Sequence, residues 1–313
     1  MTRYSLRLNN DLEPQTYRRI AATAEHGGLH QMWISHDLRW HAAPALVADL
    51  AARTEHLRLG IGLHNPYTVH PVELAMIGAT LDELTDGRFD LAVGAGAAGF
   101  LDLIGIDRTR PLTTMRSALT GIRELLAGTP VTDPRWDRDL RLARSAPSVG
   151  LWLGATGPRM RALGGELADG VLALALPPRA HARIESEVRA GQPARSLTTA
   201  PEVPVCVWLS VDHDPRAADQ ALAAKLAVYG AELGPDLLSE AGLVASDFDP
   251  MPDELSPAMR SLAVVGDVDE VVERCREILS TGVSHLSFGP PLGPDPVTAV
   301  QALVEQVLPQ LPG

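Results

Sequence analysis

The residues Ser35-His36-Asp37, with Trp40 close behind them, form a group that could carry out chemistry. A histidine beside an aspartate can transfer a proton or hold a ring hydroxyl, because the pKa of histidine lies near neutral pH. The group directly follows the apolar stretch 31–34, which places it at the carboxyl end of an expected strand. The alternative is an ordinary surface loop.

A second group, Gly62-Leu63-His64-Asn65, follows the apolar stretch that begins at residue 57. Asn65 precedes a proline, a pair that favours a turn. A glycine lets backbone or ligand approach closely, although it is also compatible with an ordinary strand. His64 is a candidate for a proton donor, a substrate contact or simple packing.

A third group, Gly94-Ala95-Gly96-Ala97, ends the apolar stretch 89–93. Such small residues allow a planar ring or another backbone to come close. As a phosphate loop the motif is weak, because a glycine-rich motif identifies a dinucleotide site only after the first strand of a Rossmann unit. The segment after the first expected strand, 8–11, contains no glycine.

A fourth group, Thr156-Gly157-Pro158-Arg159, follows the apolar stretch 149–153. Glycine followed by proline at a helix start leaves free amides at the positive end of the helix dipole, which suits a phosphate. Pro177 and Arg179 follow the next apolar stretch, and Arg159 and Arg179 could add positive charge. The alternative is an ordinary helix start.

Apolar stretches typical of strands alternate along the chain with helical patterns, and this alternation predicts parallel βαβ units. Eight such units predict one closed (β/α)8 TIM barrel, occupying residues 1–313 as a single domain, rather than an open sheet. The strands are expected at 4–8, 31–35, 57–63, 89–93, 149–153, 170–174, 203–211 and 284–288. The helices are expected at 14–26, 43–54, 71–84, 112–126, 159–167, 179–189, 216–229, 268–280 and 297–308.

Two segments, 129–147 and 231–257, have no such pattern and are rich in proline and charge. Long loops in a compact fold are often lids or substrate loops. The alternative is a surface insertion with short helices of its own.

The composition excludes several classes of protein. The 313 residues carry a formal net charge of −12, which argues against nucleic-acid binding. Cys206 and Cys275 are too few for a disulfide framework, and no histidine or cysteine spacing is typical of a metal site. No apolar stretch reaches the roughly 18 residues that a membrane span needs. We therefore expect a cytoplasmic protein with a small-molecule substrate, no membrane partner and no metal.

Three longer motifs resemble a known family. The sequences NPYTVHP at 65–71, ATLDELTDGRFDLAVGAG at 79–96 and GELADGVLALAL at 165–176 resemble the bacterial luciferase-like superfamily. Within it, the chain resembles the methylenetetrahydromethanopterin reductase branch, which uses the deazaflavin coenzyme F420. The resemblance implies a TIM barrel, F420 as cofactor (FMN as the alternative), and a homodimer formed through the helices at 43–54 and 71–84.

The resemblance also implies roles for individual residues. In deazaflavin-using relatives, a bulge with a non-prolyl cis peptide lies at the position of Gly62 and Leu63 and backs the deazaflavin ring. The related sugar-phosphate dehydrogenases carry a histidine with a tryptophan four residues later, a spacing that this chain keeps, and a glutamate at the position of Ala97, which it lacks. The implied cofactor contacts are Ser35, Asp37, Trp40, Gly62, Leu63, Asn65, Gly94, Ala95, Gly96, Ala97, Thr156, Gly157, Pro158, Arg159, Pro177 and Arg179.

The leading hypothesis is an oxidoreductase that delivers a hydride from reduced F420 to a small organic acceptor, a C=N or an activated C=C bond. The deazaflavin carries the hydride chemistry, while the protein supplies orientation and a proton. His36 is the first candidate for the proton donor and His64 the second. One alternative is an FMN-dependent monooxygenase that uses oxygen, and another is a flavin-binding barrel without catalysis.

Overall fold

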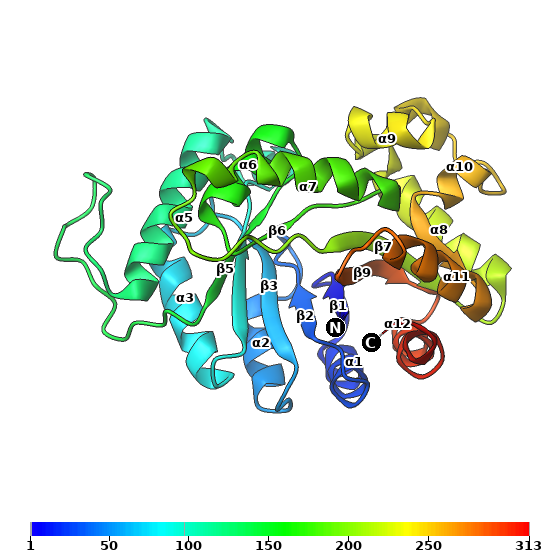
Figure 1. Cartoon of the computed structure of the whole chain (residues 1–313), viewed down its shortest axis with the longest axis horizontal. Helices are drawn as coiled ribbons and strands as arrows, with labels where there is room; N and C mark the ends of the chain where they lie inside the picture. Colours follow the sequence, from blue (N-terminus) through cyan, green and yellow to red (C-terminus); the bar gives the residue numbers. More distant parts are fainter. Residues whose placement is uncertain (1, 97, 313) are drawn as a thin grey trace.

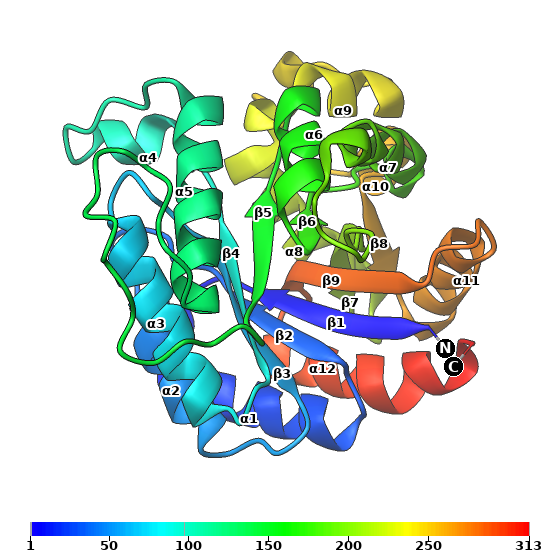
Figure 2. The same ribbon diagram turned by 60° about the vertical axis from the view of Figure 1, so that its left-hand side comes forward.

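The computed structural model describes residues 2–96 and 98–312, which form one curled parallel sheet surrounded by helices (Figure 1 and Figure 2). Within these residues the sheet order is β6-β5-β4-β3-β2-β1-β9-β7-β8. The strands are β1 (Arg3–Leu8), β2 (Gln31–Ile34), β3 (Arg58–His64), β4 (Phe89–Val93), β5 (Gly150–Gly154), β6 (Gly170–Leu172), β7 (Val205–Val211), β8 (Ala263–Gly266) and β9 (His285–Leu292).

The sheet closes into a barrel where the segment of β6 pairs with the segment of β7. Two isolated parallel bridges, Gly170 to Glu202 and Leu174 to Cys206, join the two segments. The Ala175 amide donates to the Cys206 carbonyl at 2.8 Å, which continues the ladder beyond β6. The predicted barrel fold is therefore confirmed, although the strand expected at 170–174 ends at Leu172.

Strand β8 was not expected from the sequence. It pairs with the second half of β7, from Trp208 to Val211. Its four residues follow the proline-rich segment 231–257, and so short an apolar stretch has no periodicity that separates a strand from a helix. The expectation of eight strands is corrected to nine within the described residues.

Helices follow most of the strands, and many of them begin with a proline, whose fixed φ suits the first helical turn. All nine expected helices are present, and the last continues from α12 as a π-helical and then a 3-10 turn. Helices α1 and α12 lie side by side, with both chain ends near them (Figure 1 and Figure 2). The helices are α1 (Pro14–His26), α2 (Ala43–Ala51), α3 (Pro71–Leu84), α4 (Ala98–Asp102), α5 (Pro111–Ala127), α6 (Pro158–Leu167), α7 (His181–Arg189), α8 (Pro215–Tyr229), α9 (Pro235–Ala241), α10 (Pro257–Arg260), α11 (Val268–Leu279) and α12 (Pro296–Ala302).

Two tryptophans fill the interior of the barrel. Trp33 and Trp152 pack edge to face with ring centroids 5.2 Å apart. A Cβ atom added at Gly60 would overlap the Trp33 ring, and one at Gly170 would overlap the Trp152 ring. These glycines are therefore required by packing, and the plugged interior leaves the carboxyl ends of the strands as the place for a site.

The two irregular segments differ from each other. Segment 129–147 contains turns but neither helix nor strand. Segment 231–257 contains α9 and a 3-10 turn at Ala245–Phe248, so it is an insertion with short helices. Its Leu238 and Phe248 join Leu222 and Leu226 of α8 in a second apolar cluster. This cluster holds the insertion against α8.

A polar network closes the amino-terminal end of the barrel. His285 Nε2 lies 2.8 Å from Ser5 Oγ, and His285 Nδ1 is bonded to Glu202, which also pairs with Arg3 at 2.8 Å. The order serine, histidine, carboxylate is that of a hydrolase triad. Ser5 is fully buried, however, and this face of a barrel serves stability. The network is therefore structural.

Among the described residues, no helix combines the length and the apolar character needed to cross a bilayer.

Candidate active site

Asn10 orders the loop that follows β2, although sequence reasoning did not single it out. Its side chain is fully buried. Its Nδ2 donates to the carbonyls of Asp37 and His41 at 2.9 and 2.7 Å, and its Oδ1 accepts from the Asp37 amide at 3.2 Å. Ser35 Oγ lies 2.8 Å from Asp37 Oδ2 and 3.1 Å from Asn10 Oδ1. The sequence signal for Asn10 was its place just after β1, because the polar group that follows the neighbouring strand β2 lies at the same edge of the sheet.

His36 caps the next helix. The Ala43 amide at the start of α2 donates to His36 Nδ1 at 3.1 Å. In the neutral imidazole the proton therefore resides on Nε2, which is left as a donor. Burial lowers the pKa of His36 below its ordinary value, against an opposing effect of the Asp37 carboxylate.

His64 stacks on His36, so the structure brings the two candidate histidines together. Their ring centroids are 4.3 Å apart with an interplanar angle of 40°. His64 is only 1 % exposed, and within the described residues neither of its ring nitrogens has a hydrogen-bond partner. Burial, with a contribution from His36, lowers the pKa of His64 to about 3. Burial therefore favours the neutral form of both rings.

The bulge expected at the end of β3 is present. The peptide Gly62–Leu63 is cis, and the register with β4 shifts between Gly62 and His64. The Leu63 side chain lies across the ends of β4 and β5. A Cβ added at Gly94 would be 2.6 Å from Leu63 Cδ1, and one at Gly154 would overlap the same side chain. Three strand ends therefore meet in one apolar surface.

Asn65 ties the turn after β3 to the end of β4. Its Oδ1 accepts from the Tyr67 amide at 2.9 Å, and its Nδ2 donates to the Ala95 carbonyl at 3.4 Å. Gly96 has a φ of +67°, and an added Cβ there would be 2.6 Å from Asn65 Nδ2. The expected turn is confirmed. Ala97, the last residue of this predicted group, lies outside the described residues.

The start of α6 has the features expected of a phosphate seat. Gly157 is the N-cap residue, with Pro158 next, and no side-chain cap bond is formed at this helix start among the residues that the structure describes. Thr156 and Arg159 are exposed. The buried Arg161 donates to the Thr156 carbonyl at 2.8 Å, which fixes the loop from beneath. Uncapped amides at the positive end of a helix favour an anion.

Three predicted residues remain, namely Pro177, Arg179 and Trp40, and they differ in burial and in contacts. Pro177 is buried and follows a cis peptide. Arg179 is exposed and donates to the Glu240 carbonyl in α9, so its side chain is engaged with the insertion. Trp40 is 55 % exposed. Among the described residues, no three His, Cys, Asp or Glu side chains are grouped as a metal site would require.

Comparison with known proteins gives consistent relatives. The chain is 28 % identical to 5,10-methylenetetrahydromethanopterin reductase of Archaeoglobus fulgidus, over 92 % of this chain and 93 % of that protein. It is also 28 % identical to F420-dependent glucose-6-phosphate dehydrogenase of Nakamurella multipartita, over 95 % and 93 %. The solved F420-dependent tetrahydromethanopterin reductase of Methanopyrus kandleri superposes with a TM-score of 0.87 at 26 % identity, covering 99 % of each chain.

A second solved structure, an F420-dependent secondary alcohol dehydrogenase in complex with an F420-acetone adduct, superposes with a TM-score of 0.81 over 100 % of this chain and 99 % of that chain. Its identity of 18 % supports the shared fold alone. The family model described as luciferase-like monooxygenase matches residues 3–285. With the barrel, the β3 bulge and the glycine-rich strand ends in place, the chain belongs to the luciferase-like monooxygenase family.

Proposed function

We propose that this protein is an F420-dependent oxidoreductase that transfers a hydride between the deazaflavin and a small organic acceptor with a C=N or an activated C=C bond. The observation that carries the proposal is the register shift of β3 between Gly62 and His64, with Leu63 packed over Gly94 and Gly154. It forms an apolar surface where three strand ends meet. The named F420-dependent reductases and dehydrogenases among its relatives support the same cofactor.

The residues present fit a deazaflavin cofactor. The planar ring would lie against the Leu63 surface, beside the turn fixed by Asn65. The phosphate would take the uncapped amides at Gly157, with the exposed cation of Arg159 nearby in the sequence. Ser35 and Asp37 would bind polar groups of the ring. When bound, reduced F420 supplies the hydride.

The histidine pair would hold the acceptor. His36 Nε2 carries the proton of the neutral ring, so it can donate a hydrogen bond to an oxygen or nitrogen of the acceptor. His64 offers two buried nitrogens that have no partner in the described part of the chain, and a buried polar group without a partner typically costs about 1–3 kcal/mol. A bound ligand that supplies these partners would recover part of that cost.

Turnover tests this function. The full chain is mixed with reduced F420 and a panel containing a cyclic imine and a cyclic enone, and reoxidation is followed by the visible absorbance of the deazaflavin. We expect at least one acceptor to speed reoxidation under anaerobic conditions, with less effect in His36→Ala. Oxidation that requires oxygen and reduced FMN, with no acceptor effect, would favour the monooxygenase alternative. Binding of a flavin without any turnover would favour a non-catalytic barrel.

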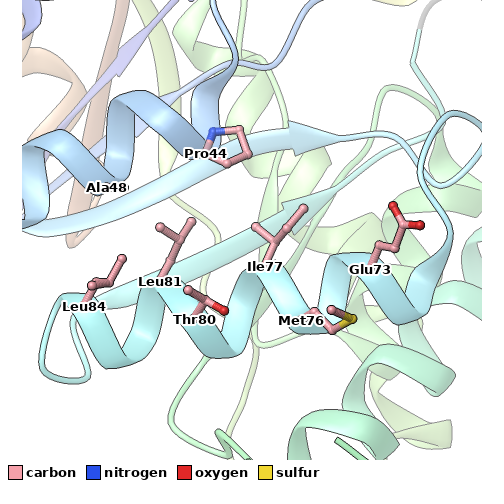
Figure 3. Close-up of a pocket in the computed structure, with 8 residues that line it drawn as sticks. All are labelled: Pro44, Ala48, Glu73, Met76, Ile77, Thr80, Leu81 and Leu84. Atoms are coloured by element: carbon pink, nitrogen blue, oxygen red, sulfur yellow. The ribbon is translucent and has the colours of Figure 1, made fainter.

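We also propose a homodimer formed through α2 and α3. A groove of about 560 Å³ runs between these helices, lined mostly by apolar side chains (Figure 3). Met76 and Leu84 on α3 are each about half exposed, at 54 % and 51 %. Large apolar side chains exposed beside an apolar groove are typical of an interface. A second copy would bury them.

A further inference from the structure

Lys225 is the only lysine of the chain, and its surroundings are unusual. Its Nζ lies 3.9 Å from the centroid of the Tyr229 ring, on the same helix α8, and 5.6 Å from the Trp208 ring. Both distances are those of cation–π contacts. Within the described residues, Lys225 forms no ion pair with a carboxylate and no hydrogen bond, although it is partly buried.

The ammonium group lies on the side of the barrel that carries the candidate site. Trp208 packs with Leu222 and Leu226 of α8, on the face of β7 opposite to Val207 and Leu209. Asp11 follows β1 and Asp37 follows β2, and both are close enough to act on the charge of Lys225. Lys225 therefore lies beside the middle of β7 and near the residues that follow β1 and β2, where Asp37 adjoins His36.

Two cations, Lys225 and Arg7, face two carboxylates, Asp11 and Asp37, and among the described residues neither carboxylate forms an ion pair with Lys225. Burial lowers the pKa of Lys225 to about 8, with Arg7 acting in the same direction and Asp11 and Asp37 against it. The side chain is therefore an ammonium at pH 7. Arg7 donates only to the carbonyls of Val207 and Ser287, and its buried Nε has no partner within the described residues.

We propose that Lys225, held on the faces of Tyr229 and Trp208, binds a carboxylate carried by the acceptor substrate. An ammonium is a point charge without a fixed fork of donors, and here part of its surface faces aromatic rings. Asp11 and Asp37 oppose a phosphate dianion more strongly than a single negative charge. The inference deepens the proposed function, because it names the acceptor of that reaction as a carboxylic acid.

The single lysine makes a direct test available. The full chain is labelled with lysine carrying ¹³C at Cε, which gives one lysine side-chain resonance, and acetate is the probe. We expect a saturable shift of this resonance with acetate, and a smaller effect of phosphate and of chloride at equal ionic strength. Because the ammonium loses its proton above its pKa of about 8, acetate is expected to bind about thirtyfold more weakly near pH 9.5 than near pH 7.

Matched variants complete the test. Calorimetry is expected to show acetate binding lost in Lys225→Met and kept in Arg216→Met, which removes an exposed cation at the start of the same helix. Equal shifts with acetate and chloride, or acetate binding that survives in Lys225→Met, would overturn the proposal. Because acetate binding needs no F420, its outcome is separate from that of cofactor binding: acetate binding without F420 binding would contradict the proposed function alone.

Discussion

Replacing His64 with leucine is expected to make the protein more stable, although the residue lies in the candidate site. The His64 ring is 1 % exposed, and both of its nitrogens lack partners within the described residues. An unsatisfied buried polar group typically costs about 1–3 kcal/mol, and an apolar side chain of similar size removes that cost. We expect His64→Leu to raise the free energy of unfolding by about 1–2 kcal/mol at pH 7, after the loss of the contact with His36.

The pH dependence gives a second magnitude. In the folded protein the pKa of His64 is about 3, against an ordinary value of 6.5. Below pH 6.5 the unfolded chain therefore binds a proton that the folded protein does not, so stability falls as the pH falls. Each pH unit in this window contributes about 1.4 kcal/mol, which gives about 2 kcal/mol at pH 5. In His64→Leu, the free energy of unfolding is therefore expected to fall by about 2 kcal/mol less between pH 6.5 and pH 5.

His285 provides the matched control. It is also buried, but its two ring nitrogens are bonded to Glu202 and Ser5. The same change, His285→Leu, leaves Ser5 Oγ without this partner and Glu202 with Arg3 alone, and is expected to cost about 2–4 kcal/mol. Urea unfolding of the three proteins at pH 7 and pH 5 measures both effects. If His64→Leu is as destabilising as His285→Leu, the ring of His64 is satisfied in the folded protein and the reasoning is refuted.

Three further changes have expected outcomes. Gly154→Ala places a methyl group against Leu63. It is expected to weaken F420 binding at least tenfold in a fluorescence titration and to lower the free energy of unfolding by about 1–3 kcal/mol. In the control Gly234→Ala the added methyl meets no described atom within 4 Å and is expected to leave binding and stability unchanged, and equal effects of the two changes would contradict the packing argument. Asn10→Ala removes the buried hydrogen bonds of the β2 loop and is expected to lower the free energy of unfolding by about 2–3 kcal/mol, measured with urea; a loss below 1 kcal/mol would contradict that role. Met76→Glu is expected to convert a dimer to a monomer in light scattering, and an unchanged mass would contradict the α2–α3 interface.

The regular part of the fold followed from local patterns. Alternating apolar stretches and helices, with prolines such as Pro71 and Pro158 at helix starts, indicated the barrel and most element bounds. Strand β8 was missed because four apolar residues carry no period. Helix α4 (Ala98–Asp102) was also missed, since five residues are too few to show a helical period.

The sequence predicted which groups lie at the same edge of the sheet, but it did not predict the contacts between their side chains. Because parallel strands end at one edge, the groups at His36, His64 and Gly94 were expected to be neighbours. The stacking of His64 on His36 could not be predicted, since it depends on the register shift in β3. The contacts of Lys225 depend on how α8 lies over β7, which the helical pattern of α8 does not specify.

The central claim is that the surface around Leu63 and the start of α6 bind a deazaflavin. The most direct measurement is a fluorescence titration of the purified full chain with oxidised F420, run beside an identical titration with FMN. Saturable binding of F420, much tighter than that of FMN and weakened in Gly154→Ala, is the predicted result. Binding of FMN alone, or of neither molecule, would contradict the claim.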